Sequence, residues 1–534
     1  MRRWNGWGDD SVEVQLPAEA SSFLEARIGA GTAPQDASFE QACAGLPPGR
    51  LPAHPLLDAS PATRARHALG HSLPDWLRLR NGRLGNVPDA VSFPETSTQV
   101  RELLALAARL DANVIPWGGG TSVVGHLEVP GGARFAVRPV LSIDMSRMRS
   151  LISLDREALL ACFGAGVTGA ELEAQLGAHG YTLGHFPQSF EQSTLGGWIA
   201  TRSSGQQSLR YGRFETLFAG GRIETPAGTL DIPTLPASSA GIDLREMVLG
   251  SEGRLGIVTH ASVRISRRPE HEAFHAFFFP NWHSALQALR VLTQARLGLS
   301  MLRLSNPLET ETMLALAGPG RPIGLLKHYL RWRGCGLEKC MLLVGSSGYK
   351  AQVGEAIGAA RSVALRHRGV QGGRALGEQW RRNRFRSAHL RNALWAQGYA
   401  VDCVETALDW PHVTRALEAI ERAAAAALEP FGERVHAFSH LSQVYAQGAS
   451  VSTTLVYRLS GDFDLDLTRW RQLKERVSGA VVGCGGTISH QHGVGLDHAP
   501  WLAAEKGELG VGAMGALLRH FDPEVRMNPG KLLA

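Results

Sequence analysis

Three loops rich in glycine and hydroxyl residues, each next to a strand-like run, constrain this chain more than any other feature of its sequence. They occupy residues 116–122, 187–201 and 250–258. Glycine lets main-chain N–H groups approach a pyrophosphate closely, and serine and threonine add further donors. One such loop alone is a common tight turn. Three of them in one chain predict a site for a large cofactor that carries phosphate groups.

A fourth glycine pattern, Gly164 to Gly169, tests whether that cofactor is a nicotinamide dinucleotide. The pattern fits G-x-G-x-x-G, follows the strand-like run Ala158 to Phe163 and precedes an expected helix at Glu171 to Leu176. A true motif of this kind is followed by an acidic residue about 20 residues further on, at the end of the next strand. The nearest candidate, Glu191, falls within a polar loop. The sequence therefore disfavours a nicotinamide site.

The three loops, in this order and spacing, resemble the FAD-binding loops of the vanillyl-alcohol oxidase superfamily. The resemblance implies an α+β fold, with a PCMH-type FAD-binding domain of two α+β subdomains and a separate α+β cap domain. His126 lies four residues past Ser122, in a region where some members attach the flavin, but we expect noncovalent FAD. The expected cofactor-binding residues are Pro116, Trp117, Gly118, Gly119, Gly120, Thr121, Ser122, Gln188, Ser189, Ser193, Thr194, Gly197, Thr201, Arg202, Ser203, Ser204, Glu252, Gly256, Ile257 and Val258.

Three further segments are similar to the alkyl-dihydroxyacetonephosphate synthase family within that superfamily. They are RWNGWG at 3–8, ATRSSG at 200–205 and SHQHGVG at 489–495, so the resemblance spans nearly the whole chain. It implies an enzyme in which the flavin N5 attacks an acyl-dihydroxyacetone phosphate. The fatty acid leaves, and a fatty alcohol takes its place to give an ether.

The chain has 534 residues, more than one hydrophobic core usually organises. Changes in composition and in expected secondary structure divide it into four parts. A Pro-, Ala- and Arg-rich start predicts a helical N-terminal extension at 1–88. Short strands, glycines and helices predict the FAD-binding domain at 89–270. Longer helices, such as the one expected at Trp282 to Gln294, predict the cap or substrate domain at 271–500. The turn-rich end, 501–534, is expected to return to the FAD-binding domain.

The family's reaction requires cations for the substrate phosphate and a residue that transfers a proton. By resemblance, Arg391 stands where the family's phosphate-binding arginine would be, and Arg303 matches another functionally important arginine. The family's catalytic tyrosine follows the glycine of a Y-x-x-G turn by four residues. Counting from the turn that begins at Tyr445 gives Ser452, whose hydroxyl is a much weaker acid than a phenol. The middle histidine of the family's triplet is Gln491 here, which cannot act as an acid or base.

His490 and His492 remain, either as bases near neutral pH or as groups that only hydrogen-bond the flavin or the backbone. Three hypotheses follow. The first is a synthase-type transferase with a remodelled site, acting on an anionic substrate at the flavin N5. The second is an FAD-linked oxidase or dehydrogenase of a 2-hydroxy acid or alcohol, which the C-terminal sequence NPGK mildly favours. The third is a non-catalytic protein that binds flavin or lipid.

Composition narrows the partners and the location. The formal charge of +6, without a long basic block, favours anionic ligands slightly and predicts no nucleic-acid partner. We expect a small-molecule or lipid substrate with an anionic group, and a homodimer. Of six scattered cysteines only Cys335 and Cys340 lie close together, which predicts no metal site and suits a reducing cytoplasm. No signal sequence or long apolar run is present, so we expect a cytoplasmic protein, with peripheral membrane contact left open.

Overall fold

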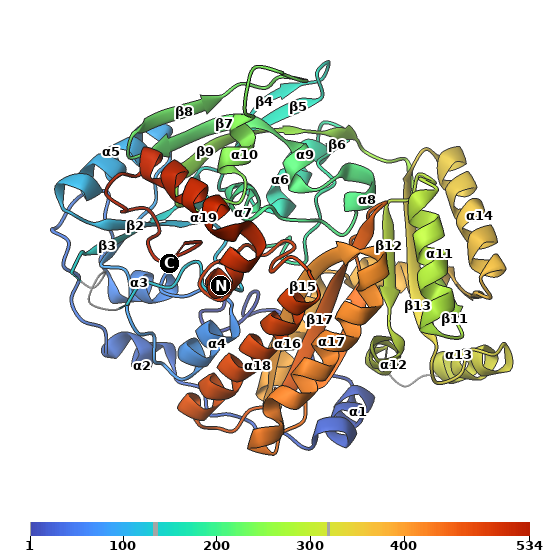
Figure 1. The fold of residues 1–534 in the computed structure, drawn as a ribbon. Helices are drawn as coiled ribbons and strands as arrows, with labels where there is room; N and C mark the ends of the chain where they lie inside the picture. Colours follow the sequence, from blue (N-terminus) through green and yellow to red (C-terminus); the bar gives the residue numbers. More distant parts are fainter. Residues whose placement is uncertain (1, 132–136, 318–320, 534) are drawn as a thin grey trace.

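The strand-like runs assemble into four sheets in this computed structural model, which describes residues 2–131, 137–317 and 321–533. Figure 1 shows two bodies of mixed helix and sheet beside one another. The body on the left contains a three-stranded and a five-stranded sheet. The body on the right contains a seven-stranded sheet with long helices packed against it. The fold is therefore α+β throughout.

The first sheet is parallel and places the first glycine loop at its carboxyl edge. Its strand order is β1-β3-β2, and loop 116–122 begins within the last residues of β2. Carboxyl edges of parallel strands are where α/β structures commonly bind ligands. The strands are β1 (Ala90–Ser92), β2 (Asn113–Trp117) and β3 (Val140–Asp144).

The second sheet of this body is antiparallel, in the order β4-β5-β9-β7-β8, with a short pair β6-β10 beside it. Burial alternates along β9, as expected for a sheet with one covered face. The competing glycine pattern lies here, at the end of β5 and the start of α6. A Cβ atom at Gly166 would lie 1.7 Å from the carbonyl oxygen of Met145, so this glycine allows the two subdomains to touch. The strands are β4 (Leu151–Asp155), β5 (Leu160–Gly164), β6 (Tyr181–Thr182), β7 (Phe218–Thr225), β8 (Gly228–Ile232), β9 (Ile257–Arg264) and β10 (Ser266–Arg267).

Helices of the first body surround these sheets. Thr96 caps α5, whose apolar face packs on the parallel sheet through Val100, Leu103 and Ala107. The helices are η1 (Met145–Arg147), α5 (Ser97–Arg109), α6 (Gly169–Gly177), α7 (Leu195–Thr201), α8 (Ser208–Tyr211), α9 (Phe214–Leu217) and α10 (Leu244–Val248).

The third large sheet forms the second body and is antiparallel throughout, in the order β14-β11-β13-β12-β16-β17-β15. Apolar side chains on one face, among them Leu302, Leu342 and Val451, form a core with α11, α14, α17 and α18. Each such buried side chain stabilises the fold by about 1.5–3 kcal/mol. The strands are β11 (His271–Phe279), β12 (Met301–Ser305), β13 (Cys340–Gly348), β14 (Val370–Gly373), β15 (Tyr399–Asp409), β16 (His436–Leu441) and β17 (Gly448–Arg458).

The opposite face of this sheet carries a row of polar side chains, Glu405, Ser452 and His440, between two apolar patches. Helices α13 and α15 cover one patch and α1 covers the other, so the polar row is left for the site described below. The helices of this body are α11 (Trp282–Gln294), α12 (Pro307–Leu316), α13 (Arg321–Trp332), α14 (Lys350–Arg366), α15 (Arg374–Asn383), η2 (Arg386–His389), α16 (Leu390–Ala396), α17 (Trp410–Leu428), η3 (Glu429–Phe431) and α18 (Phe463–Gly483).

Both ends of the chain pack on these bodies. Leu24 and Ile28 of α1 pack on the large sheet, whereas the N–H of Asn528 donates to the carbonyl of Val114 in β2. Figure 1 shows α19 crossing back over the first body. The terminal helices are α1 (Ala18–Ile28), α2 (Phe39–Ala44), α3 (Pro61–Arg66), α4 (Leu73–Arg80), η4 (Ala499–Trp501) and α19 (Leu502–Phe521).

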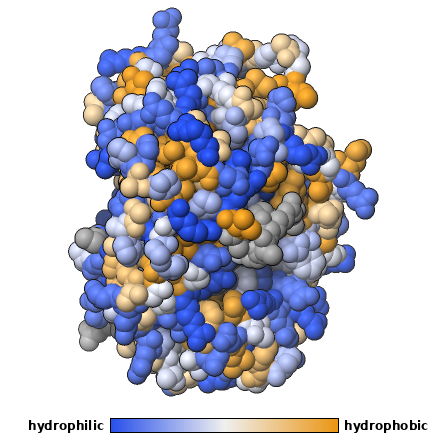
Figure 2. All heavy atoms as spheres, turned by 90° about the vertical axis from the view of Figure 1, so that its left-hand side faces the viewer, coloured by the Kyte–Doolittle hydropathy of each residue, from blue (hydrophilic) through white to orange (hydrophobic). Residues whose placement is uncertain are grey.

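The surface of the first body is mostly hydrophilic. Figure 2 shows this face, with apolar residues in separate small groups among polar ones. Among the helices of the described residues, none combines the length and the apolar character needed to cross a bilayer.

Candidate functional site

The three glycine loops meet at one place in the first body. A Cβ atom at Gly119 would lie 1.9 Å from the carbonyl oxygen of Gln192, and one at Gly118 would lie 2.4 Å from Thr194 Oγ1, so the first loop touches the second. Likewise a Cβ atom at Gly253 would lie 2.9 Å from the Pro116 ring, so the third loop touches the first. Only glycine permits contacts this close.

A cavity of about 250 Å³ opens where the first two loops meet. Its wall combines glycine backbone with serine and threonine hydroxyls, donors that suit a diphosphate, and it also contains two arginines and three carboxylates. Two buried atoms, Gln192 Oε1 in the second loop and Ser204 Oγ three residues beyond it, have no hydrogen-bond partner among the described residues. Unpartnered buried polar atoms call for a ligand or water, so the site fits FAD. The lining residues are Arg2, Gly8, Asp9, Gly118, Gly119, Ser146, Arg149, Gly166, Thr168, Glu171, Glu191, Gln192 and Thr194.

Other residues expected to bind the cofactor have varied surroundings. Thr194 caps α7, where its hydroxyl accepts from the N–H of Gly197. The side chain of Arg202 is held outside the cavity by Glu246, 2.7 Å away, and by the carbonyl of Leu249. Gln188 Nε2 donates to Ser387 of η2 over 3.0 Å and so joins the second loop to the cap.

Glu252 of the third loop holds the histidine motif in place. Its carboxylate accepts from the N–H groups of Val494 and Gly495, at 2.5 and 2.9 Å. The same carboxylate lies 3.0 Å from His126 Nε2, and His126 Nδ1 lies 2.7 Å from Ser122 Oγ of the first loop. Glu252 and His126 are buried and Ser122 is partly buried, so these bonds connect two cofactor loops with the histidine motif.

The polar row on the large sheet is fixed by strand register. Glu405 of β15 is paired with Ser452 of β17, which is paired with His440 of β16. Directly opposite side chains on neighbouring strands point to the same face. The predicted Ser452 therefore lies in the site, between a buried carboxylate and an imidazole.

His490 is the centre of a hydrogen-bonded group at one end of this row. Its Nδ1 lies 3.0 Å from Glu405 Oε1, and its Nε2 lies 2.6 Å from the Tyr445 hydroxyl and 2.6 Å from Arg213 Nη1. Burial alone would raise the pKa of Glu405, but the hydrogen bond from His490 and the nearby histidine charges lower it to about 2. Burial raises the pKa of Tyr445, and the Arg213 guanidinium opposes that rise.

The neighbours of His490 in the motif have different roles. Gln491 Nε2 donates to Glu405 Oε2 over 2.6 Å, so this residue orients the carboxylate. His492 Nε2 lies 3.9 Å from the same oxygen, and its side chain is 29% exposed. Burial lowers the pKa of His492, so its imidazole is neutral and able to accept a proton at neutral pH.

The two predicted anion-binding arginines differ in how far their charge is already balanced. Arg303 Nη2 donates to buried Glu309 over 2.7 Å and lies 3.2 Å from His440 Nδ1. Arg391 lies over the Trp76 ring at 4.2 Å and donates to the carbonyl of His71, and it has no carboxylate within ion-pair distance among the described residues. Burial lowers the pKa of Arg391 to about 10, so it is charged at neutral pH.

Sequence reasoning missed Tyr445, Glu405 and Arg213. Tyr445 opens the Y-x-x-G turn that served as a landmark, and the turn forms, since its N–H donates to the carbonyl of Gly448. Glu405 lies within β15, a strand that was not among the predicted elements. Nothing in the sequence places Arg213, in the loop before α9, next to a motif 277 residues away.

Comparison with known proteins agrees with this geometry. Residues 88–231 match the FAD binding domain family, and residues 268–532 match the family of C-terminal domains of FAD linked oxidases. The alkyldihydroxyacetonephosphate synthase of Dictyostelium discoideum is 31% identical, over 88% of this chain and 77% of that protein. That of Trypanosoma brucei brucei is 30% identical, over 99% of this chain and 92% of that protein.

Solved structures and more distant relatives extend the comparison. An alkyldihydroxyacetonephosphate synthase structure superposes with a TM-score of 0.84 at 27% identity, over 99% of this chain and 98% of that one. p-Cresol methylhydroxylase, at 15% identity, shares the fold with a TM-score of 0.66, over 89% of this chain and 93% of that one. The mitochondrial D-lactate dehydrogenase [cytochrome] of Arabidopsis thaliana is 24% identical, over 84% of this chain and 74% of that protein. The chain therefore belongs to the alkyldihydroxyacetonephosphate synthase family and is an FAD-dependent enzyme of the PCMH fold.

Proposed function

We propose that this enzyme carries out the ether-forming transfer of its family, with the Tyr445 hydroxyl on His490 as its proton-transfer group. The observation that carries the proposal is the 2.6 Å contact between Tyr445 and His490 Nε2, with Glu405 at 3.0 Å behind the imidazole. The position of the family's tyrosine is Ser452 here, yet a phenol is present in the same pocket from the neighbouring turn. Bound FAD supplies the N5 atom at which the substrate exchanges its fatty acid for a fatty alcohol.

The side chains of this group form a directed path for a proton. Glu405 is ionised and accepts the Nδ1 proton of His490, which leaves the Nε2 lone pair facing the Tyr445 hydroxyl. When the phenol passes its proton to Nε2, Arg213 Nη1 gives up its 2.6 Å contact with that nitrogen and stabilises the phenolate, 3.1 Å away, while Glu405 stabilises the imidazolium. The phenolate is then able to take a proton from the incoming alcohol.

Substrate recognition falls to the cap in this proposal. Arg391 binds the anionic group, because its charge is free of a carboxylate partner, whereas Arg303 holds His440 in place together with Glu309. The loops at 116–122, 187–201 and 250–258 hold FAD. Residues 89–270 then form the cofactor domain, and 271–500 the substrate domain, with 1–88 and 501–534 packed on both.

We propose that FAD is bound without a covalent bond. His126, four residues past the first loop, is buried, with Nδ1 2.7 Å from Ser122 Oγ and Nε2 3.0 Å from the Glu252 carboxylate. Acid precipitation of the purified protein should release all of the flavin to the supernatant. Flavin that stays with the precipitate would contradict this.

The Tyr445→Phe variant tests the proton-transfer assignment. Loss of a positioned acid–base group lowers kcat by about 10²- to 10⁴-fold. Transfer of a labelled fatty alcohol onto acyl-dihydroxyacetone phosphate measures it, and the flavin absorbance should remain unchanged. Tyr349→Phe, at a tyrosine that is 56% exposed, is the matched control. Full activity of Tyr445→Phe would overturn the assignment.

Oxidation of a 2-hydroxy acid is the second candidate. The neutral, half-buried imidazole of His492 favours it, because a base that faces the site can take a hydroxyl proton. Anaerobic mixing with 2-hydroxy acids would then bleach the flavin. If no acid bleaches it while labelled fatty acid exchanges out of acyl-dihydroxyacetone phosphate, the transferase assignment stands.

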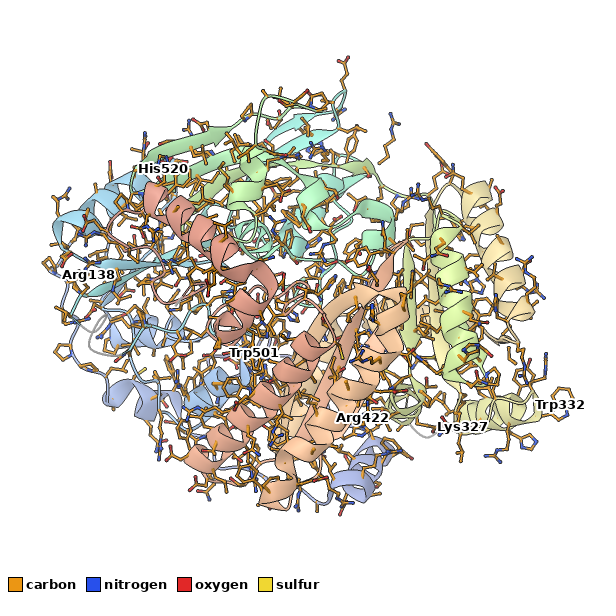
Figure 3. All side chains as sticks on the ribbon, in the orientation of Figure 1. Arg138, Lys327, Trp332, Arg422, Trp501 and His520 are labelled. Atoms are coloured by element: carbon orange, nitrogen blue, oxygen red, sulfur yellow. The ribbon has the colours of Figure 1, made fainter. Side chains whose placement is uncertain are left out.

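A peripheral membrane contact is proposed at the tip of the second body. Leu325 and Trp332 of α13, with nearby Leu337, are 70, 78 and 86% exposed. Figure 3 shows Trp332 at this tip, pointing away from the body. Exposed Arg331 and Arg333 flank Trp332, and a basic apolar helix of this kind suits an anionic bilayer.

Vesicle sedimentation tests this surface. Trp332→Ser should lower binding to vesicles of anionic lipid, and Leu509→Ser, at a leucine that is 90% exposed in α19, should leave it unchanged. Equal binding of both variants would show that this surface does not contact the membrane. The homodimer and the cytoplasmic location stay predictions, which light scattering of the purified holoenzyme and cell fractionation would test.

A further inference from the structure

The N-terminal segment, residues 2–9, lies across the cofactor cavity rather than at the periphery. Arg2, Gly8 and Asp9 belong to the cavity wall, together with Gly118 and Gly119 of the first loop. The guanidinium of Arg2 lies so close to the first loop that a Cβ atom at Gly120 would be 2.7 Å from its Nη2. The segment therefore shares one surface with the loop that is expected to bind pyrophosphate.

Arg2 differs from the other charged residues of this wall because its charge has no direct partner. Its side chain forms no ion pair or hydrogen bond with the part of the chain that the structure describes. Arg149, the other cation, pairs with Glu171 at 3.0 Å. The carboxylate of Asp144 raises the pKa of Arg2 without forming an ion pair with it, and its oxygens are bonded to His67 and to the N–H of Ser146.

A guanidinium in this position requires an anion. It stays charged in proteins, and a partly buried charge without a partner is costly. Burial lowers the pKa of Arg2, as expected for a cation removed from water. The diphosphate of FAD carries two negative charges: the glycine backbone of the first loop would donate N–H groups to it, and Arg2 would supply the positive charge that the backbone lacks.

The cap holds this segment in place. The Asn392 side chain accepts from the N–H of Trp7 over 3.0 Å and donates to the carbonyl of Trp7 over 2.8 Å. Gly8 has φ +86°, and a Cβ atom there would lie 2.3 Å from the His389 ring. Both contacts come from η2 and α16, so the second body fixes the segment over the cofactor site of the first.

We infer that residues 2–9 are part of the FAD site, with Arg2 as the cation that binds the cofactor diphosphate and Asn392 as the clamp that keeps the segment closed. This inference rests on FAD binding by the three loops. On this inference, residues 2–9 form one wall of the FAD site, on a side that the three loops leave open.

The dissociation constant of FAD, measured by flavin fluorescence on the apoprotein, tests the inference. Arg2→Ala should weaken FAD binding by about 10- to 100-fold, the range for loss of a charged hydrogen bond, and Arg2→Lys should restore part of it. Arg422→Ala, at an exposed arginine of α17 outside the cofactor site, is the control, and it should bind FAD like the unmodified protein. Asn392→Ala should speed FAD release.

The outcomes separate this inference from the proposed function. If the unmodified protein bound no FAD, the proposed function itself would be contradicted. Unmodified protein that binds FAD, with Arg2→Ala binding it equally well, would overturn the role of Arg2 alone. Thermal unfolding of the two apoproteins shows whether the substitution has damaged the fold, and an Arg2→Ala apoprotein as stable as the parent with weak FAD binding supports the inference.

Discussion

The cofactor loops and the proton-transfer pocket are built in opposite ways. The loops bind through backbone, and their fit depends on atoms that glycine lacks, as at Gly119 against Gln192. The pocket binds through side chains, with Tyr445, His490 and Glu405 brought from a turn, a loop and a strand. Adding atoms should therefore damage the cofactor loops, whereas removing atoms should damage the proton-transfer pocket. The four predictions below test that contrast.

His490→Ala should have the largest effect, since it removes the base from the pocket and leaves the cofactor loops intact. Turnover should fall by about 10²- to 10⁴-fold. The FAD content, measured by absorbance, should be unchanged. His283→Ala, at an exposed histidine of α11, is the control. Loss of FAD together with activity would show that the two regions are not separable.

Arg391→Ala should raise KM for the anionic substrate by a factor corresponding to about 2–5 kcal/mol, the range for truncating one partner of a buried charge pair. The reason is that no carboxylate of the described residues lies within ion-pair distance of this guanidinium, although Asp402 and Asp75 lie near enough to raise its pKa. Arg422→Ala, on the outer surface of α17, should leave KM unchanged. An unchanged KM in Arg391→Ala would remove Arg391 from the substrate site.

Glu405→Gln should change how stability depends on pH. Its carboxylate has a pKa of about 2 when folded, below the ordinary 4.5, so its ionised form stabilises the fold above pH 4.5. That contribution, roughly 3 kcal/mol, is lost as pH falls from 4.5 towards 2. The difference in unfolding free energy between the parent and Glu405→Gln should therefore shrink on acidification. Denaturant titrations at several pH values measure it, and a constant difference would contradict the prediction.

Gly119→Ala should have the smallest effect in free energy, yet it addresses the backbone-built site. The added methyl group must displace the carbonyl of Gln192, at a cost of about 1–3 kcal/mol, and FAD should bind correspondingly more weakly. Gly177→Ala, where no atom lies within 4 Å, is the same substitution in open space. Equal FAD affinity in both variants would show that the loop contact is dispensable.

The same contrast explains what the sequence could predict. Glycine loops carry a local signal because the residues that form them are contiguous, and the family comparison confirms the FAD cofactor and the α+β fold. Helices such as α11 were predicted at their observed bounds, since a strong apolar periodicity is also local. Glu405, Tyr445 and Arg213 meet only through strand pairing and domain docking. Such long-range contacts leave no pattern of spacing in one sequence.

The carboxylate of Glu252 limits how this enzyme could be rebuilt. Because it bonds to the backbone of Val494 and Gly495, a third-loop residue orders the segment that follows the last cap helix. A chimera that joins this FAD-binding domain to another relative's cap would break these bonds at the junction unless residues 489–495 travelled with the domain. For recombination, the natural unit is therefore discontinuous: the cofactor domain together with the chain that returns to it.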